Sequence, residues 1–182
     1  MIRRGVGARS TRTLALIAIA GVAVMLCGCP FSSDRPLADP RAAAVEPALA
    51  GTWRMQDPES GEWNVLTIFP FDEHEMVAFA PEKDSSKVSA FRLFVTEVDA
   101  ERFLNVQELG ASDTSWFFAR FKVGGDRMQL TVVDDELFSK RSFATSADLR
   151  EFIRAHLGDP LLYASAGDTP MESAWQRGAP KP

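Results

Sequence analysis

Short segments in which large apolar residues alternate with polar ones, separated by turn residues, dominate the chain between residues 63 and 133. Such alternation has the period of a β-strand with one buried face. It predicts strands at 63–71, 75–80, 89–98, 102–109, 115–123 and 126–133. Gly124-Gly125 joins the last two strands, and glycine readily adopts the positive φ angles of a tight hairpin turn. Regular strands with short turns predict a mostly β fold, an antiparallel sandwich or barrel.

One amphipathic helix is predicted after these strands. Thr145 and Asp148 form a T-x-x-D capping box at its start. Apolar residues then recur at helical spacing, at Leu149, Phe152, Ile153 and Leu157. Gly158 and Pro160 end the helix. We expect it to lie against the sheet or to plug one end of it, and residues 161–164 to return as a last strand.

The alternation also predicts which side chains fill the interior. They are Phe69, Phe71, Phe91, Leu93, Phe117, Phe121 and Leu130. Packed at the usual density of protein interiors, such large side chains leave no pocket of at least ~300 Å³, the size that a drug-sized ligand needs.

The segment 115–123 is unusual because it is apolar on both faces. Phe117 and Phe121 lie on one face, and Trp116 and Phe118 lie on the other. A strand of this kind is normally covered on both sides, and the helix can provide the second cover. Alternatively, the second face joins an exposed aromatic patch.

That alternative gives a candidate binding surface. Its four residues are Trp63, Phe69, Trp116 and Phe118. A patch of this kind marks a surface for a partner or ligand.

The N-terminus has the pattern of a secretion signal. Four arginines between Arg3 and Arg12 precede an apolar run from Leu14 to Leu26. The run is shorter than the ~20 residues that span a bilayer, which favours a signal peptide over a transmembrane helix. The signal is expected to comprise residues 1–28.

The run ends in Leu26-Cys27-Gly28-Cys29, which resembles the lipobox of bacterial lipoproteins. The resemblance implies cleavage before Cys29 and attachment of a diacylglycerol, with acyl chains such as palmitate, to its sulfur. Two or more chains anchor a protein stably to a membrane. In enteric bacteria an aspartate after the cysteine favours inner-membrane retention. Because Pro30 stands there, the resemblance slightly favours the outer membrane facing the periplasm over the outer face of the inner membrane.

Charge and cysteine content exclude several classes of partner and site. Removal of the signal takes four of the 20 basic residues and leaves 16 against 25 acidic ones, a net charge near −9. Nucleic acid is therefore not an expected partner, since its phosphates require clustered Lys and Arg. The chain has two cysteines, both at the cleavage site, so we expect neither a disulfide nor a zinc site in the mature domain.

The composition divides the mature chain into three parts. Residues 29–48 are rich in proline and alanine and predict an extended tether behind the lipidated cysteine. Residues 49–166 hold the patterned domain. Residues 167–182 lose periodicity and predict a flexible tail.

Few residues suggest chemistry. Asp72-Glu73-His74-Glu75 groups ligands that suit several divalent metals, but a solvated charged turn explains it better. His156 is expected to pack at the end of the helix. No fingerprint of a hydrolase, metalloprotease or nucleotide-binding site is present. The sequence predicts no catalytic residue, no metal and no cofactor.

The domain begins with Leu49-Ala50-Gly51-Thr52-Trp53, which resembles the L-x-G-x-W motif of lipocalin-like barrels. The resemblance implies a tight bend at Gly51 and a barrel floor closed by Trp53. The patterned region is short for a full lipocalin, which favours a small or incomplete barrel. The leading hypothesis is a non-catalytic, membrane-tethered module that binds an envelope protein. A carrier of a small apolar ligand comes second, and a hydrolase third.

Overall fold

A computed structural model describes residues 30–58, 60–82, 87–139, 141–163, 165–166, 169–170 and 172–178. The expected signal peptide and Cys29 lie outside the described residues. The strands are β1 (Ser32–Ser33), β2 (Gly51–Gln56), β3 (Trp63–Pro70), β4 (Met76–Pro81), β5 (Val88–Val98), β6 (Glu101–Leu109), β7 (Trp116–Gly124), β8 (Arg127–Val132), β9 (Ser165–Ala166), β10 (Thr169–Pro170) and β11 (Ser173–Arg177). The helices are α2 (Ser146–Ala155) and the 3₁₀ turns η1 (Pro40–Ala42), η2 (Pro47–Leu49), η3 (Glu136–Phe138) and η4 (Pro160–Leu162).

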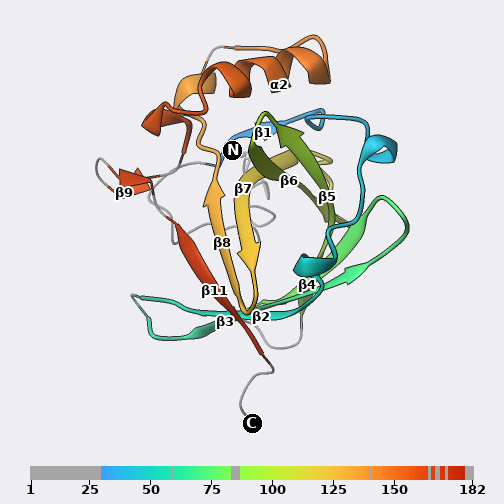
Figure 1. Cartoon of the computed structure of the whole chain (residues 1–182), viewed down its shortest axis with the longest axis vertical. Helices are drawn as coiled ribbons and strands as arrows, with labels where there is room; N and C mark the ends of the chain where they lie inside the picture. The colour runs from blue at the N-terminus through green and yellow to red at the C-terminus, as the bar shows by residue number, and fades with distance from the viewer. Residues whose placement is uncertain are drawn as a thin grey trace, which may run out of the picture.

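Eight antiparallel strands form a closed barrel, which is compatible with a lipocalin-like fold (Figure 1). β2 to β8 run up and down in chain order, each paired with the next. β11 then inserts between β2 and β8 and completes the ring. The mostly β prediction is confirmed, and the barrel is closed rather than incomplete.

The C-terminal segment differs from the flexible tail predicted for 167–182. Within it, β11 pairs with both of its neighbours, and the side chain of Trp175 is buried in the barrel. Its indole Nε1 donates a hydrogen bond to Ser173 Oγ (3.1 Å). The prediction was wrong for this strand because five residues are too few to show a clear alternation.

The predicted strands of the meander are confirmed, but one face was assigned wrongly. In β3 the inward side chains are those of Leu66 and Ile68. Phe69 and Phe71 lie outside, and their side chains are exposed. Both faces of this segment are apolar, so alternation alone did not distinguish them. Pairing of Trp53 with Leu66 sets the register, because residues directly opposite in a ladder share a face.

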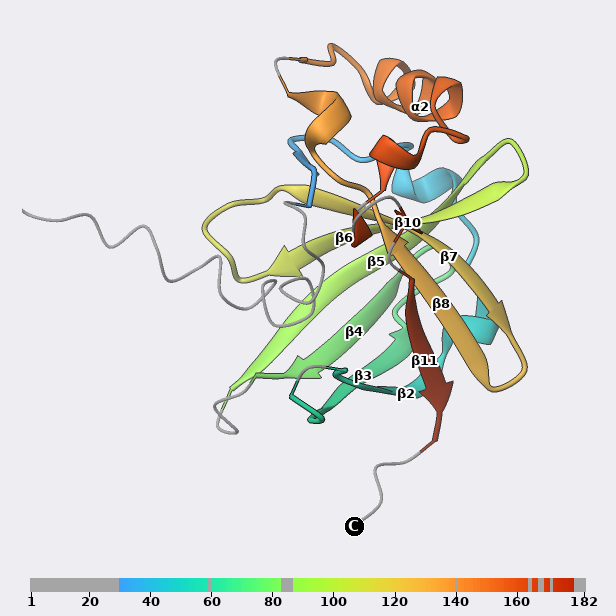
Figure 2. The same ribbon diagram turned by 90° about the vertical axis from the view of Figure 1, so that its left-hand side faces the viewer.

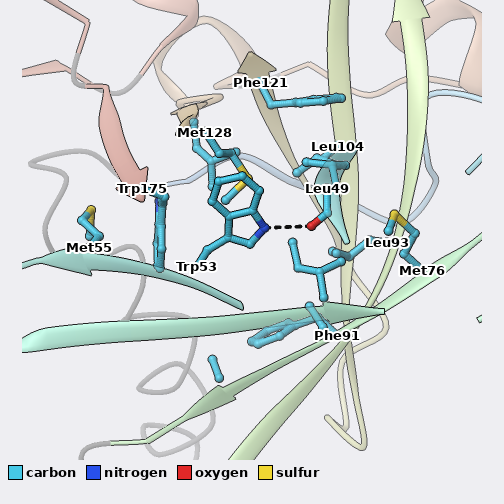
Figure 3. Packing of buried hydrophobic residues seen from close by; sticks show 14 residues of the cluster. Leu49, Trp53, Met55, Met76, Phe91, Leu93, Leu104, Phe121, Met128 and Trp175 are labelled. Atoms are coloured by element: carbon cyan, nitrogen blue, oxygen red, sulfur yellow. Dashed lines mark hydrogen bonds between the residues drawn. The ribbon is translucent and has the colours of Figure 1, made fainter. Parts of the chain in front are cut away.

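Buried apolar side chains from all eight strands fill the barrel interior (Figure 3). Trp53 lies at one end, fully buried, and its Nε1 donates to the carbonyl oxygen of Leu49 in η2 (2.8 Å). We call this the closed end. Gly51, with φ +135°, makes the bend between η2 and β2 that an L side chain rarely adopts. Burial of Trp53 at this end agrees with the role that the L-x-G-x-W resemblance implies.

A second apolar core lies outside the barrel. It packs the outer face of β5, β6 and β7 against a layer made of α2, the turns η3 and η4, and the N-terminal segment (Figure 2). Its members include Phe94, Phe103 and Phe118 from the strands, with Leu149 and Ile153 from α2. The expectation that the helix covers the sheet is confirmed.

The N-terminal segment belongs to this layer, so the extended tether predicted for 29–48 is wrong for its described residues. Leu37 is fully buried, and its backbone N–H donates to Asn105 Oδ1 (2.8 Å). Asn105 is itself fully buried and donates to Thr96 Oγ1 (2.9 Å). Two large apolar residues, Phe31 and Leu37, fix a segment whose proline and alanine content suggested an open chain.

The helix begins as predicted. Thr145 and Asp148 form the full capping box, each side chain accepting from the other residue's backbone N–H. The strand expected at 161–164 is wrong: η4 occupies Pro160–Leu162, and Tyr163 makes one isolated bridge to Val133. Pro160 follows the N-cap Asp159 and favours a new helical turn over an extended strand.

Candidate functional site

A small cavity of about 120 Å³ lies within the barrel, and its lining is apolar. The lining residues are Pro30, Leu66, Ile68, Ala78, Phe91, Leu93, Leu104, Val106, Phe117, Phe118, Ala119, Met128, Leu130 and Val132. The volume is below the ~300 Å³ of ordinary ligand pockets. It is close to that of engineered apolar cavities that stay dry and admit benzene, about 150 Å³.

The cavity lies toward the end of the barrel opposite Trp53. We call this end the mouth: it carries the β2–β3, β4–β5 and β6–β7 connections, whereas the β3–β4, β5–β6 and β7–β8 turns lie at the closed end (Figure 2). Pro30 reaches the lining because it bridges to Asp134, just beyond the last residue of β8.

Carboxylates face inward at the mouth. Glu108 pairs with Phe91, which lines the cavity, so the two side chains share the inner face. Burial raises the pKa of Glu108 above its ordinary value, and the nearby charge of Glu82 raises it further. Glu82 in turn accepts a hydrogen bond from Ser89 Oγ (3.1 Å). The carboxylates of Glu82 and Glu108 therefore lie between the apolar cavity and the mouth of the barrel.

Two of the four residues predicted as a binding surface are not on the surface. Trp116 and Phe118 are buried in the second core, so their assignment to an exposed patch is wrong. Trp116 packs edge-on against Phe94 (ring centroids 5.4 Å apart), and Phe118 lies 5.9 Å from Phe31. The N-terminal segment, expected to be a tether, supplies part of the cover.

The other two, Trp63 and Phe69, are exposed to 54% and 50%. They are six positions apart along β3, about 20 Å at the rise of a β-strand, so they do not form one cluster. Phe69 instead joins Phe79 of β4, with ring centroids 6.4 Å apart.

The residues around Phe69 form what we call the β3–β4 patch. It comprises Phe69, Phe71, Val77 and Phe79, of which Phe71 is 72% exposed. Phe69 pairs directly with Val77 across the ladder, and Phe79 is its diagonal neighbour. Phe79 was not predicted from the sequence, although its place in an alternating segment opposite β3 would have identified it.

The charged group at 72–75 organises a turn. Asp72 Oδ1 accepts from the backbone N–H groups of His74 (2.7 Å) and Glu75 (2.8 Å), and these bonds lower the pKa of Asp72. The Nδ1–H of His74 donates to the carbonyl oxygen of Ala43 (2.8 Å). Glu75 is buried and forms a two-bond ion pair with Arg92. These side chains are thus already paired within the fold.

The remaining polar candidates are also structural. His156 packs on Phe152 at the end of α2 (ring centroids 4.2 Å apart), as predicted. Asp134 is buried and accepts from the backbone N–H of Glu136, and burial raises its pKa. Within the described residues, no three His, Cys, Asp or Glu side chains are grouped so that they could hold a metal ion.

Over the same residues, none of the helices has the length and apolar character needed to cross a bilayer. Comparison with known proteins adds no assignment. No protein-family model matches the chain, and neither the curated proteins nor the solved structures searched gave a match.

Proposed function

We propose that the chain is a membrane-tethered envelope lipoprotein whose barrel is a non-catalytic module for binding an envelope protein. The anchor is the acylated Cys29, and the docking surface is the β3–β4 patch. The partner would present an apolar surface to this patch. In this proposal the barrel supplies a rigid support for the exposed aromatic side chains.

The observation that carries the proposal is the exposure of three phenylalanines on one sheet face. Phe69, Phe71 and Phe79 face outward, and the second core covers a different part of the barrel. Exposed aromatic side chains held on rigid strands bind at little entropic cost and are common at protein interfaces. Ligand binding in the interior cavity would not explain the exposure of these three rings, because none of them lines the cavity.

The test places a photo-crosslinking residue at position 69 in the native cell envelope. A crosslinked partner should appear at position 69, and it should be absent when the same residue is placed at Ala174, exposed on the outer face of β11. The partner identified in this way is then purified for binding measurements with the lipoprotein.

The double variant Phe69→Ser/Phe79→Ser should weaken this binding at least ~tenfold, as loss of a hot spot does. It should fold normally, because both rings are exposed. Unchanged affinity in the double variant, or equal crosslinking from Ala174, would count against the β3–β4 patch as the docking surface.

A second candidate function is a carrier of a small apolar ligand, and the cavity is the observation that favours it. Its lining is apolar, but its volume of about 120 Å³ suits a molecule nearer benzene than a fatty acid in size. We therefore expect the domain not to displace a fluorescent fatty-acid probe at micromolar concentration. Saturable one-to-one probe binding that Phe117→Trp abolishes would make the carrier the better interpretation.

A further inference from the structure

We propose that the mouth of the barrel rests directly on the lipid bilayer that holds the anchor, with a zwitterionic lipid surface as its partner. This goes beyond the proposed function and rests on one part of it, the acylation of Cys29. It does not depend on the β3–β4 patch.

The first residues after the anchor are fixed to the barrel. Pro30 bridges to Asp134, and the backbone N–H of Phe31 donates to the carbonyl oxygen of Val133 (2.9 Å). The ring of Phe31 is buried and stacks on Phe138, with centroids 3.7 Å apart. β1 then pairs with β7. The chain therefore has no slack between the anchor and the fold.

This attachment limits how far the domain can stand from the membrane. Consecutive Cα atoms are about 3.8 Å apart, so Cys29 lies within one residue's reach of Pro30. Because the acyl chains on Cys29 must lie in the hydrocarbon region, the lipid headgroups lie close to Pro30. Pro30 is at the mouth of the barrel, where it lines the cavity.

The mouth carries the exposed apolar side chains that a lipid surface would contact. We call them the mouth collar: Trp63, Pro81, Val88 and Leu109, each at the mouth end of its strand. Pro81 pairs with Val88, and Leu109 pairs with Ala90 on the same outer face, so these three members of the collar lie on the neighbouring strands β4, β5 and β6. Tryptophan is favoured at the boundary between lipid and water.

The charge at the mouth indicates which lipids fit. Glu82 and Glu108 lie there, and the mature chain carries a net charge near −9. Anionic headgroups would repel such a surface, whereas zwitterionic ones carry no net charge. The expected partner is therefore a phosphatidylcholine- or phosphatidylethanolamine-type surface.

The distribution of tryptophans provides a direct probe. The chain has four, of which Trp53, Trp116 and Trp175 are buried and Trp63 is exposed. Phe71 is an exposed aromatic just beyond the far end of β3, so Trp63→Phe/Phe71→Trp moves the exposed tryptophan from the mouth to the closed end. Both substituted side chains are exposed, and the fold should tolerate the exchange.

The experiment uses the mature, acylated full-length protein reconstituted into phosphatidylcholine vesicles with brominated or unbrominated acyl chains. The brominated lipid should reduce the tryptophan emission of the native protein, and Trp63→Phe should remove that loss. The double variant should behave like Trp63→Phe. A Gly/Ser insertion of twenty residues between Cys29 and Pro30, or replacement of half of the lipid by phosphatidylglycerol, should reduce the quenching.

Flotation of the vesicles distinguishes failure of the anchor from failure of the docking of the mouth. Protein that does not float with the vesicles lacks the anchor, which overturns both the proposed tethering and this inference. Protein that floats but shows no quenching at Trp63, or equal quenching at Phe71→Trp, keeps the anchor and overturns the docking of the mouth. Quenching that the twenty-residue insertion leaves unchanged would also contradict it.

Discussion

The guanidinium of Arg177 lies over the indole ring of Trp53, 4.3 Å from the ring centroid. Its two terminal nitrogens donate hydrogen bonds to the carbonyl oxygens of Ala48 and Ala50. The last strand of the barrel is thereby joined to the turn that precedes the first strand. This contact completes the closed end, and stability should depend strongly on both of its sides.

Replacement of Trp53 by alanine should lower the free energy of unfolding by about 3–5 kcal/mol, as truncation of large buried aromatics does. That is a large part of the ~5–15 kcal/mol typical of a domain. Chemical denaturation of both proteins measures the difference. Phe71→Ala serves as the matched control, because its ring is exposed and should change stability by less than ~0.5 kcal/mol. Similar small effects in both variants would show that Trp53 is peripheral.

The closing strand gives a second stability prediction. Trp175→Ala should also lower the free energy of unfolding by about 3–5 kcal/mol, because the ring is buried in the interior. The neighbouring Gln176 is exposed, so Gln176→Ala should be close to neutral. Thermal denaturation followed by circular dichroism compares the two. If residues 173–177 were a flexible tail, both variants would match the native protein.

Asn105 should control the attachment of the N-terminal segment. Asn105→Ala removes the acceptor for the backbone N–H of Leu37 and leaves that buried group unpaired, at about 1–3 kcal/mol. Limited proteolysis should then cut within residues 30–48 earlier than in the native protein. Gln107→Ala, which alters a half-buried side chain two residues away on the same face, bonded to the carbonyl oxygen of Thr114 and not to the N-terminal segment, should leave the cleavage rate unchanged. Equal rates for the two variants would contradict the attachment.

Glu108 predicts a dependence of stability on pH. Its pKa is raised in the folded state, so the folded state favours the protonated form. The associated stability is present below the ordinary pKa of 4.5 and is lost as the pH rises through the higher folded value. Glu108→Gln should therefore raise the melting temperature at pH 7, and the gain should disappear near pH 4.

The companion variant Glu82→Gln tests the cause. Removing the Glu82 charge should lower the pKa of Glu108 and recover part of the same gain at pH 7. Differential scanning calorimetry from pH 4 to 8 measures both variants. A gain from Glu108→Gln that persists undiminished at pH 4 would exclude titration of this carboxyl as its origin.

The anchor prediction concerns the two cysteines. Cys29→Ser should prevent lipid attachment and cleavage, leaving the precursor held by its apolar run, while Cys27→Ser should be processed normally. Mass spectrometry of the mature N-terminus decides between them. An unmodified N-terminus, or one that begins elsewhere, would contradict the assignment of Cys29.

Much of the barrel could be predicted because alternation and turn residues act locally. The Gly124-Gly125 hairpin and the Thr145–Asp148 capping box were identified from a few adjacent residues, and both are present. The inward face of β3 was harder to predict, because Phe69 and Leu66 lie on opposite faces and are both apolar. The side that faces inward depends on pairing with β2, a contact that local alternation does not contain.

The candidate surface was only half predicted for a related reason. Trp116 and Phe118 are covered partly by Phe31 and Leu37, which lie more than 60 residues earlier in a proline-rich segment. Hydrophobic periodicity identifies an apolar face that must be buried, but it does not identify the segment that packs against this face. The strand β11 was not predicted for the same reason. It has one large apolar residue, Trp175, and a single residue cannot show the alternation of a strand.

Because β11 lies between β2 and β8, the barrel closes only when this strand has paired with both of them. Arg177 and Ala50 are 127 residues apart, and loops of such length close slowly. Until the C-terminal residues arrive, β2 and β8 each retain an open edge that can pair with other chains. A chain that has not yet placed β11 between these two strands cannot complete its barrel. The two edges would then be covered together, when β11 pairs with both strands.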